Sequence, residues 1–256
     1  MHCDKPLYPG GLAEPLPQCH GFLYQILGSS GSGKSSYMHS LFDPVHIRGK
    51  KADFVGIFDQ IFYVGPSSKS VVNNQFDDIA QDHKFPDLES FLVNYDDVRA
   101  DDIEEQRKEE KALHDKAVEK ALAQGKKSPK RPPPGDVFTL VIMDDVGAEL
   151  KDGRLEKSFN QLIHNRRHKN ISIIVLNQDY VQVPKQIRKS LNYMAAFAPK
   201  VDELDELFKK LGVPRKLYNE FLDLAYQERY DFVYADFTRG IPRLYRNQDS
   251  PLIIKR

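Results

Sequence analysis

"GSSGSGKSS", residues 28–36, is the stretch that decides the fold of this chain. Glycines and serines surround a single lysine, a composition that neither propagates a helix well nor packs a core. The apolar run at residues 21–27 before it predicts a buried strand, and residues 35–42 after it predict the start of a helix. A glycine-rich loop between a strand and a helix is the context in which this pattern carries chemistry.

The stretch fits the pattern G-x-x-x-x-G-K-[ST]. Glycines let backbone N–H groups turn inward as an anion nest, and the following helix offers its positive end to phosphates. Lys34 can then reach the β and γ phosphates, and the Ser35 hydroxyl can complete a Mg²⁺ shell. A flexible serine-glycine linker is the alternative, but it leaves the lysine unexplained. We therefore expect ATP to be held by Gly28, Ser29, Ser30, Gly31, Ser32, Gly33, Lys34, Ser35 and Ser36.

A second motif, "LVIMDD" at residues 140–145, is an apolar strand that ends in two acids. A charge at the carboxyl end of a parallel strand lies in the crevice where ligands bind. We expect Asp144 to hold Mg²⁺, directly or through water, and Asp145 to orient or deprotonate an attacking water, with Glu149 as the substitute base. The alternative is a strand that ends in a turn capped by Asp. The adjacent second acid favours hydrolysis over transfer of phosphate to another substrate.

Polar amides end a third apolar run, residues 171–176. If this strand lies between the other two, such an amide can bond the γ-phosphate or the attacking water. Gln178 is the first candidate for this sensor and Asn177 the second. An ordinary strand-end cap is the alternative.

Clustered positive charge precedes that strand in "NRRHKN", residues 165–170. Cations at a helix C-terminus interact favourably with its dipole, which is one explanation. The other is an arginine finger that enters a neighbouring subunit's site and neutralises charge on the transferred phosphoryl group. Arg166 and Arg167 are the candidates, and Arg188 is a further one.

Composition limits the class of protein. Lys plus Arg equals Asp plus Glu at 37 each in 256 residues, which argues against a protein that coats DNA but not against local DNA contacts. No long apolar run or leader pattern occurs, so we expect a soluble chain that is not secreted and has no transmembrane segment. Cys3 and Cys19 show no paired spacing, and we expect two reduced thiols.

The expected fold class is α/β, with a central, mainly parallel sheet covered by helices. An extended arm at residues 1–20 precedes a core at 21–200, and a C-terminal helical extension with edge strands follows at 201–256. A charged helical and Pro-rich insert occupies about residues 99–136. It is either an exposed excursion or a partner-binding or DNA-facing arm, with a basic tip at Lys126, Lys127, Lys130 and Arg131.

The ordered set GSSGSGKS, FTLVIMDD, NRRHKNISIIVLNQ and VPKQIRKSLNY resembles the genome-packaging ATPases of large eukaryotic DNA viruses and virophages, P-loop motors of the FtsK/HerA superfamily. The resemblance covers about residues 21–200. It implies a P-loop NTPase of the ASCE type, with Lys34 and Ser35 in the Walker A loop, Asp144 and Asp145 in the Walker B pair, and Gln178 as sensor. The second acid is Asp where many motors of the superfamily have Glu.

The resemblance further implies a homo-oligomeric ring, pentamer or hexamer, at a capsid vertex that drives double-stranded DNA into a preformed capsid with ATP. It places the protein in the viral factory of the host cell cytoplasm and in the virion. Two other classes stay open: another P-loop enzyme, such as a nucleotide kinase or a replication helicase, and a non-catalytic ATP-binding assembly factor.

Overall fold

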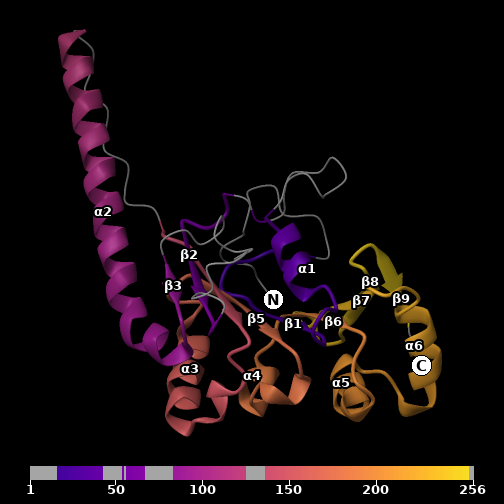
Figure 1. Cartoon of the computed structure of the whole chain (residues 1–256). Coiled ribbons are helices and arrows are strands. Elements are labelled where there is room, and N and C mark those ends of the chain that lie inside the picture. The colour runs from indigo at the N-terminus through magenta and orange to yellow at the C-terminus, as the bar shows by residue number, and fades with distance from the viewer. Residues whose placement is uncertain (1–15, 43–53, 55, 67–82, 125–135, 254–256) are drawn as a thin grey trace.

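The computed structural model describes residues 16–42, 54, 56–66, 83–124 and 136–253. Within them the chain forms one nine-stranded sheet in the order β3-β2-β4-β5-β1-β6-β7-β8-β9 (Figure 1). The first six strands of that order pair in parallel, which confirms the expected α/β class. They are β3 (Lys84–Phe85), β2 (Gln60–Val64), β4 (Thr139–Asp144), β5 (Ile171–Asn177), β1 (Leu23–Leu27) and β6 (Tyr193–Phe197).

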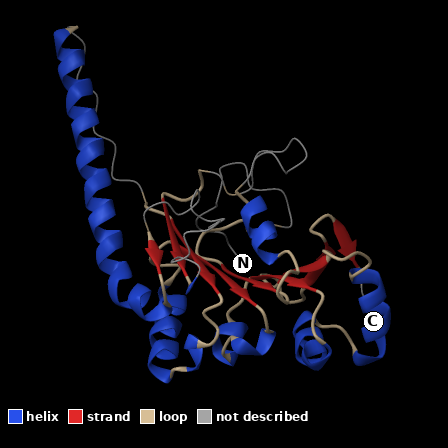
Figure 2. Ribbon diagram, in the orientation of Figure 1, coloured by secondary structure: helices blue, strands red, loops and turns tan. Residues whose placement is uncertain are grey.

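Helices cover both faces of this sheet, as Figure 2 shows. Their bounds are α1 (Lys34–Ser40), α2 (Leu88–Ala123), α3 (Gly153–Asn165), α4 (Lys185–Lys189), α5 (Leu204–Leu211) and α6 (Tyr218–Ala225). Short 3-10 turns lie between them at η2 (Glu149–Lys151), η3 (Tyr180–Gln182), η4 (Val201–Glu203) and η5 (Arg215–Leu217).

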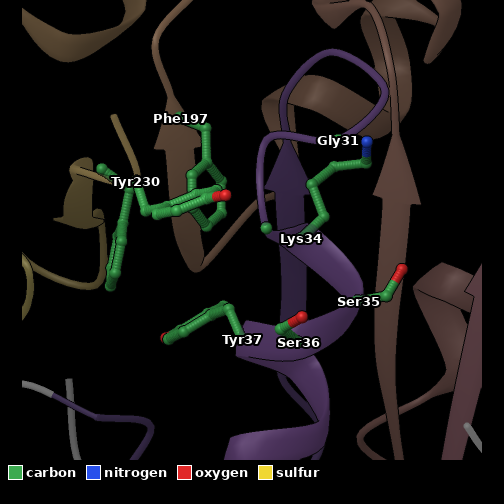
Figure 3. Close-up of a pocket in the computed structure, with 9 residues that line it drawn as sticks. Gly31, Lys34, Ser35, Ser36, Tyr37, Phe197 and Tyr230 are labelled. Carbon is green, nitrogen blue, oxygen red and sulfur yellow. The ribbon is translucent and has the colours of Figure 1, made fainter. Parts of the chain in front are cut away.

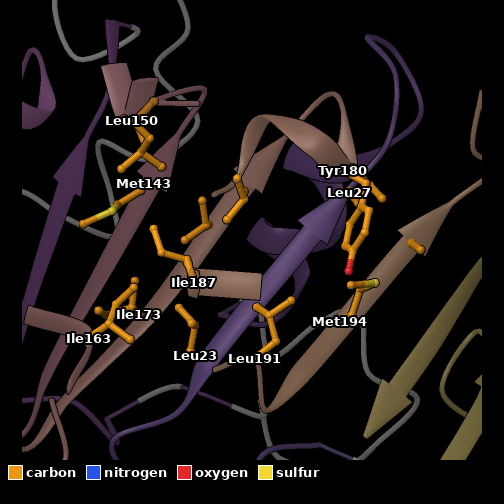
Figure 4. Packing of buried hydrophobic residues seen from close by; sticks show 14 of the residues in the cluster. Leu23, Leu27, Met143, Leu150, Ile163, Ile173, Tyr180, Ile187, Leu191 and Met194 are labelled. Atoms are coloured by element: carbon orange, nitrogen blue, oxygen red, sulfur yellow. The ribbon is translucent and has the colours of Figure 1, made fainter. Parts of the chain in front are cut away.

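Alternation along the strands divides the core into two layers. Leu23 and Leu27 of β1 join the cluster under α3, α4, α5 and α6, part of which appears in Figure 4. Tyr24 and Ile26 join the other cluster, under α1. Every residue of β1 is buried, including Gln25, its one residue with a side-chain amide, so the strand is covered on both faces, as in a central parallel strand.

The charged insert begins earlier than expected. Helix α2 starts at Leu88 rather than near residue 99, and its first turns bury Leu88, Phe91 and Tyr95 in the core. Farther along, the helix projects away from the sheet (Figure 1), and Leu113 is 67% exposed. Contacts with the sheet continue to Asp102, whose Oδ2 accepts from Gln60 Nε2 at 3.0 Å, so the described contacts anchor the N-terminal part of the helix. The predicted basic tip, with Lys126, Lys127, Lys130 and Arg131, lies outside the described residues.

The C-terminal segment extends the same sheet. Strands β7 (Phe232–Asp236), β8 (Arg243–Arg246) and β9 (Ser250–Leu252) add to β6 with antiparallel pairing. Gly212, at φ 76°, ends α5 in the left-handed conformation that glycine adopts readily. The sheet thus has no break at the domain boundary that we placed at residue 200.

Near the N-terminus the expectation of two reduced cysteines is wrong, because Cys19 is disulfide-bonded. The sequence has one other cysteine, Cys3, which lies outside the described residues together with most of the predicted arm. In the described part of the chain, no helix combines the length and apolar character needed to span a bilayer.

Candidate nucleotide-binding site

The glycine-rich loop lies between β1 and α1, as expected. Gly33 precedes the first helical residue with φ 101°, a conformation that residues with a Cβ rarely adopt. At Gly28 the constraint is space: an added Cβ would lie 2.5 Å from Ser32 Oγ and 2.8 Å from Phe197 Cβ. These positions need glycine for the loop to turn tightly over the end of the sheet.

Lys34 begins α1 and points its ammonium back over the loop. Nζ donates to the backbone oxygens of Gly28, at 2.6 Å, and Ser29, at 3.0 Å. Burial lowers the pKa of Lys34, whereas the charges of Asp144, Asp145 and Asp179 raise it. The loop lysine and the acids that end β4 therefore lie close enough to interact electrostatically, which is the juxtaposition expected of a triphosphate site.

The two acids at the end of β4 differ in environment. Asp144 is partly buried, and its Oδ2 accepts a hydrogen bond of 2.9 Å from the hydroxyl of Tyr63 on β2. Burial raises the pKa of Asp144, and the bond from Tyr63 opposes this rise. Asp145 is exposed and has φ 55°, a left-handed backbone that is uncommon for aspartate. The chain therefore turns sharply directly after Asp144, the last residue of β4.

Strand β5 lies between β4 and β1, where the sensor hypothesis needs it. Gln178 follows its last residue, and its Nε2 donates to Asp145 Oδ2 at 3.1 Å. Asn177 is only 1% exposed, and its backbone oxygen accepts from Gly28 N at 3.1 Å. Of the two sensor candidates, Gln178 faces the acids, and Asn177 ties the loop to β5.

The structure contradicts Arg166 as a finger that reaches a neighbouring subunit. Its side chain is buried, 6% exposed, and its guanidinium donates to Gly21 O (2.9 Å), Ile163 O (2.5 Å), Asn192 Oδ1 (3.0 Å) and Ser190 O (3.4 Å). Burial, together with the charge of Arg167, lowers the pKa of Arg166 to about 10, so the group stays charged at neutral pH. It joins the end of α3 to the starts of β1 and β6.

The other finger candidates are placed differently. Arg167 is exposed, and its aliphatic stem packs beside Gly21. Arg188 forms an ion pair of 2.6 Å with Glu206 and lies over the ring of Tyr180. Arg167 is therefore the candidate whose guanidinium is accessible to another subunit.

Glu149 has a structural contact that sequence reasoning missed. Its Oε2 accepts a hydrogen bond of 2.8 Å from the backbone N of Leu88, the first residue of α2. A carboxylate in this place satisfies one of the unpaired N–H groups at a helix N-terminus. This contact favours a role for Glu149 as a cap of helix α2 over the role of substitute base that we expected.

A pocket of about 580 Å³ opens beside the loop (Figure 3). It is lined by Gly31, Gly33, Lys34, Ser35, Ser36, Tyr37, Phe197, Tyr230 and Phe232. Its size lies within the range typical of small-molecule sites. Phe197 ends β6, and Tyr230 and Phe232 belong to the C-terminal extension, so residues far apart in the sequence complete the pocket.

Several site residues carried no signal in the sequence. Tyr63 lies inside an apolar run, and Tyr230 and Phe232 lie outside any motif. Asp179 forms an ion pair with Lys200, in the loop after β6, and accepts a bond of 2.8 Å from Gln182. Its place directly after Gln178 was the available signal, because polar residues past a strand end lie at the ligand edge of the sheet.

The donor set at this edge fits Mg²⁺ as a P-loop site holds it. Ser35 offers a hydroxyl, and Asp144 offers a carboxylate oxygen, both of which are hard ligands. Among the described residues no group of three or more His, Cys, Asp or Glu could hold a metal by itself. In P-loop sites generally, the nucleotide's phosphates and water supply most of the ligands of the cation.

The fold is that of a P-loop NTPase. Its sheet is mainly parallel, the glycine-rich loop follows β1, and two acids end β4, on the other side of β5 from β1. The chain belongs to the family described as Poxvirus A32 protein, whose model matches residues 18–231. A curated relative, the DNA packaging protein OPG160 of Vaccinia virus (strain Copenhagen), is 25% identical over 195 residues. This match covers 76% of the chain and 60% of the relative, so the chain accounts for less than two thirds of that protein.

Solved structures support the fold. B204, the DNA-packaging ATPase from Sulfolobus Turreted Icosahedral Virus, superposes with a TM-score of 0.50 at 17% identity, over 88% of this chain and 97% of B204. The cytoplasmic domain of the Type VII secretion ATPase EccC from Thermomonospora curvata gives a TM-score of 0.52 at 12% identity, over 93% of this chain and 27% of EccC. These likenesses concern the fold alone.

Proposed function

We propose that this chain is an ATP-hydrolysing motor that moves double-stranded viral DNA into a preformed capsid. The observation that carries the proposal is that β1 and β4 flank β5 in parallel, so the loop that carries Lys34 and the acids Asp144 and Asp145 lie at the same end of the sheet. A triphosphate between these groups would have a cation on one side and, through Mg²⁺, carboxylates on the other. The pocket beside the loop gives the rest of the nucleotide a place to bind.

The roles follow from the contacts. Lys34 and the loop hold the phosphates, and Ser35 and Asp144 hold Mg²⁺. Asp145 activates the attacking water, with Gln178 bonded to its Oδ2 and so placed to sense whether that water or the γ-phosphate is present. Asp145 is exposed and therefore accessible to water.

The DNA-packaging part of the proposal is supported by family membership and by the names of the relatives. The Vaccinia relative is a DNA packaging protein, and B204 is a DNA-packaging ATPase. We further propose a homo-oligomeric ring, pentamer or hexamer, in which Arg167 supplies the finger in trans. The ring would act at a capsid vertex in the viral factory of the host cytoplasm.

ATP turnover with and without double-stranded DNA tests the function. Turnover should need Mg²⁺, rise with DNA and vanish in Lys34→Ala, whereas Lys157→Ala, which removes an exposed lysine on α3, should match the parent protein. Transfer of phosphate to a second nucleotide would instead identify a kinase. Nucleotide binding without turnover would identify an assembly factor, and either result would refute the motor.

A further inference from the structure

The pocket beside the loop has one polar side and one aromatic side (Figure 3). Lys34, Ser35 and Ser36 form the polar side, where phosphates would lie. The other side, which we call the aromatic wall, consists of Tyr37, Phe197, Tyr230 and Phe232. A nucleotide has the same division, because its charged phosphates are joined to a flat, apolar base.

Three rings of the aromatic wall, from α1, β6 and β7, pack against one another. Tyr37 of α1 lies 4.6 Å from Phe232 of β7 between ring centroids, and Phe232 lies 5.2 Å from Phe197 of β6. Tyr230 is 56% exposed, yet its Cδ1 is only 3.4 Å from where a Cβ on Gly33 would lie. Its ring therefore stands directly beside the loop that holds the phosphates.

Phe197 and Phe232 are 2% and 8% exposed, so Tyr37 and Tyr230 present most of the ring surface that a base can reach. The Tyr37 hydroxyl is already bonded to the Tyr24 hydroxyl at 2.5 Å and to the Gln248 side-chain amide. Phe197 and Phe232 have no polar side-chain atoms. A flat base is attracted to such faces by stacking, which every base supports and which grows with ring area.

We propose that the aromatic wall binds the purine base of the nucleotide by stacking and does not distinguish adenine from guanine. The substrate class is then purine nucleoside triphosphates rather than ATP alone. This inference rests on the proposed function only in requiring that the loop binds the triphosphate. It also gives the C-terminal extension a part in the site, because Tyr230 and Phe232 come from it.

Calorimetric titration of the full chain with ATP, GTP, CTP and inorganic tripolyphosphate, in the presence of Mg²⁺, tests the proposal. For the parent protein ATP and GTP should bind within about threefold of each other, CTP should bind more weakly, and tripolyphosphate should be weakest. Tyr230→Ala should weaken ATP and GTP binding about tenfold and leave tripolyphosphate unchanged. Tyr230→Phe should retain the parent affinities, because the ring face remains.

Leu113→Ala is the matched control, since Leu113 is also exposed and belongs to α2, which projects at the opposite end of the sheet from β7 (Figure 1). Unchanged ATP affinity in Tyr230→Ala would overturn the proposal, and so would GTP binding more than about thirtyfold weaker than ATP in the parent protein. If tripolyphosphate binds as tightly as ATP, the proposed role of the aromatic wall is refuted, but the proposed function is not. If neither ligand binds, the proposed function fails as well.

Discussion

Adjacent arginines at the end of α3 allow a direct test of structural against catalytic roles. Arg166 donates to four acceptors of its own chain, whereas Arg167 is exposed. Arg166→Ala should therefore unfold at a much lower temperature than the parent protein. Arg167→Ala should keep the parent stability and lose hydrolysis.

The magnitude follows from the contacts. Three of the bonds made by Arg166 are 3.0 Å or shorter, and each contributes about 1 kcal/mol net. The bond to Ser190 O, at 3.4 Å, adds little. Removal of the guanidinium also removes the cost of burying its charge, so we use the low value of about 1 kcal/mol for each of these bonds. The free energy of unfolding should then fall by about 3 kcal/mol. For a domain of this size that lowers Tm by roughly 6–12 °C.

Thermal unfolding followed by circular dichroism gives Tm, and ATP turnover and nucleotide affinity are measured on the same preparations at a temperature where both variants are folded. Arg167→Ala should unfold within about 2 °C of the parent, because substitutions of exposed side chains usually change stability little. Mixing it with Lys34→Ala protein should restore part of the turnover if the finger acts in trans. A parent-like Tm for Arg166→Ala, together with lost turnover, would refute the structural assignment.

Three further changes test the site. Asp145→Asn should keep ATP affinity and lower kcat by about 10²–10⁴-fold, and near-parent turnover would exclude Asp145 as the base. Tyr63→Phe removes the hydrogen bond that lowers the pKa of Asp144, so that pKa should rise. On acidification, Mg²⁺-dependent turnover should therefore begin to fall at a higher pH than in the parent protein. An unchanged profile of kcat/KM against pH would contradict this. Glu149→Ala should cost about 1 kcal/mol of stability through the lost cap and leave kcat unchanged, whereas lost kcat at parent stability would restore its role as base.

The parts of the site that depend on local chemistry could be predicted from the sequence. The spacing from Gly28 to Ser35 requires a tight loop before a helix, and an apolar strand that ends in Asp144 and Asp145 places acids at the ligand edge. The amide of Gln178 followed from the same rule. Each of these predictions used only the order of strand, turn and helix along the chain.

The role of Arg166 could not be predicted from charge, because a buried and an exposed arginine look alike in "NRRHKN". A signal was present in the spacing. Phe159 and Ile163 are buried on the inner face of α3, and Arg166 continues that stripe at three residues past Ile163. Arg166 is also four residues past Leu162, near the centre of the stripe, whereas Arg167 lies at its edge. The same periodicity, at Leu88, Phe91 and Tyr95, would have placed the start of α2 on the core.

The other site residues that the sequence did not predict depend on tertiary contacts between distant segments. The C-terminal extension is the clearest case. The family match ends at residue 231, but the sheet continues through β7, whose first residue, Phe232, lines the pocket. Gln248, in the turn between β8 and β9, binds the hydroxyl of Tyr37, three residues after Lys34 on α1. A chain that ended at the family boundary would lose one face of the aromatic wall and a contact that orients another. Motif spacing identifies where the phosphates bind, whereas the surface beside them depends on strands that only the folded sheet brings to the loop.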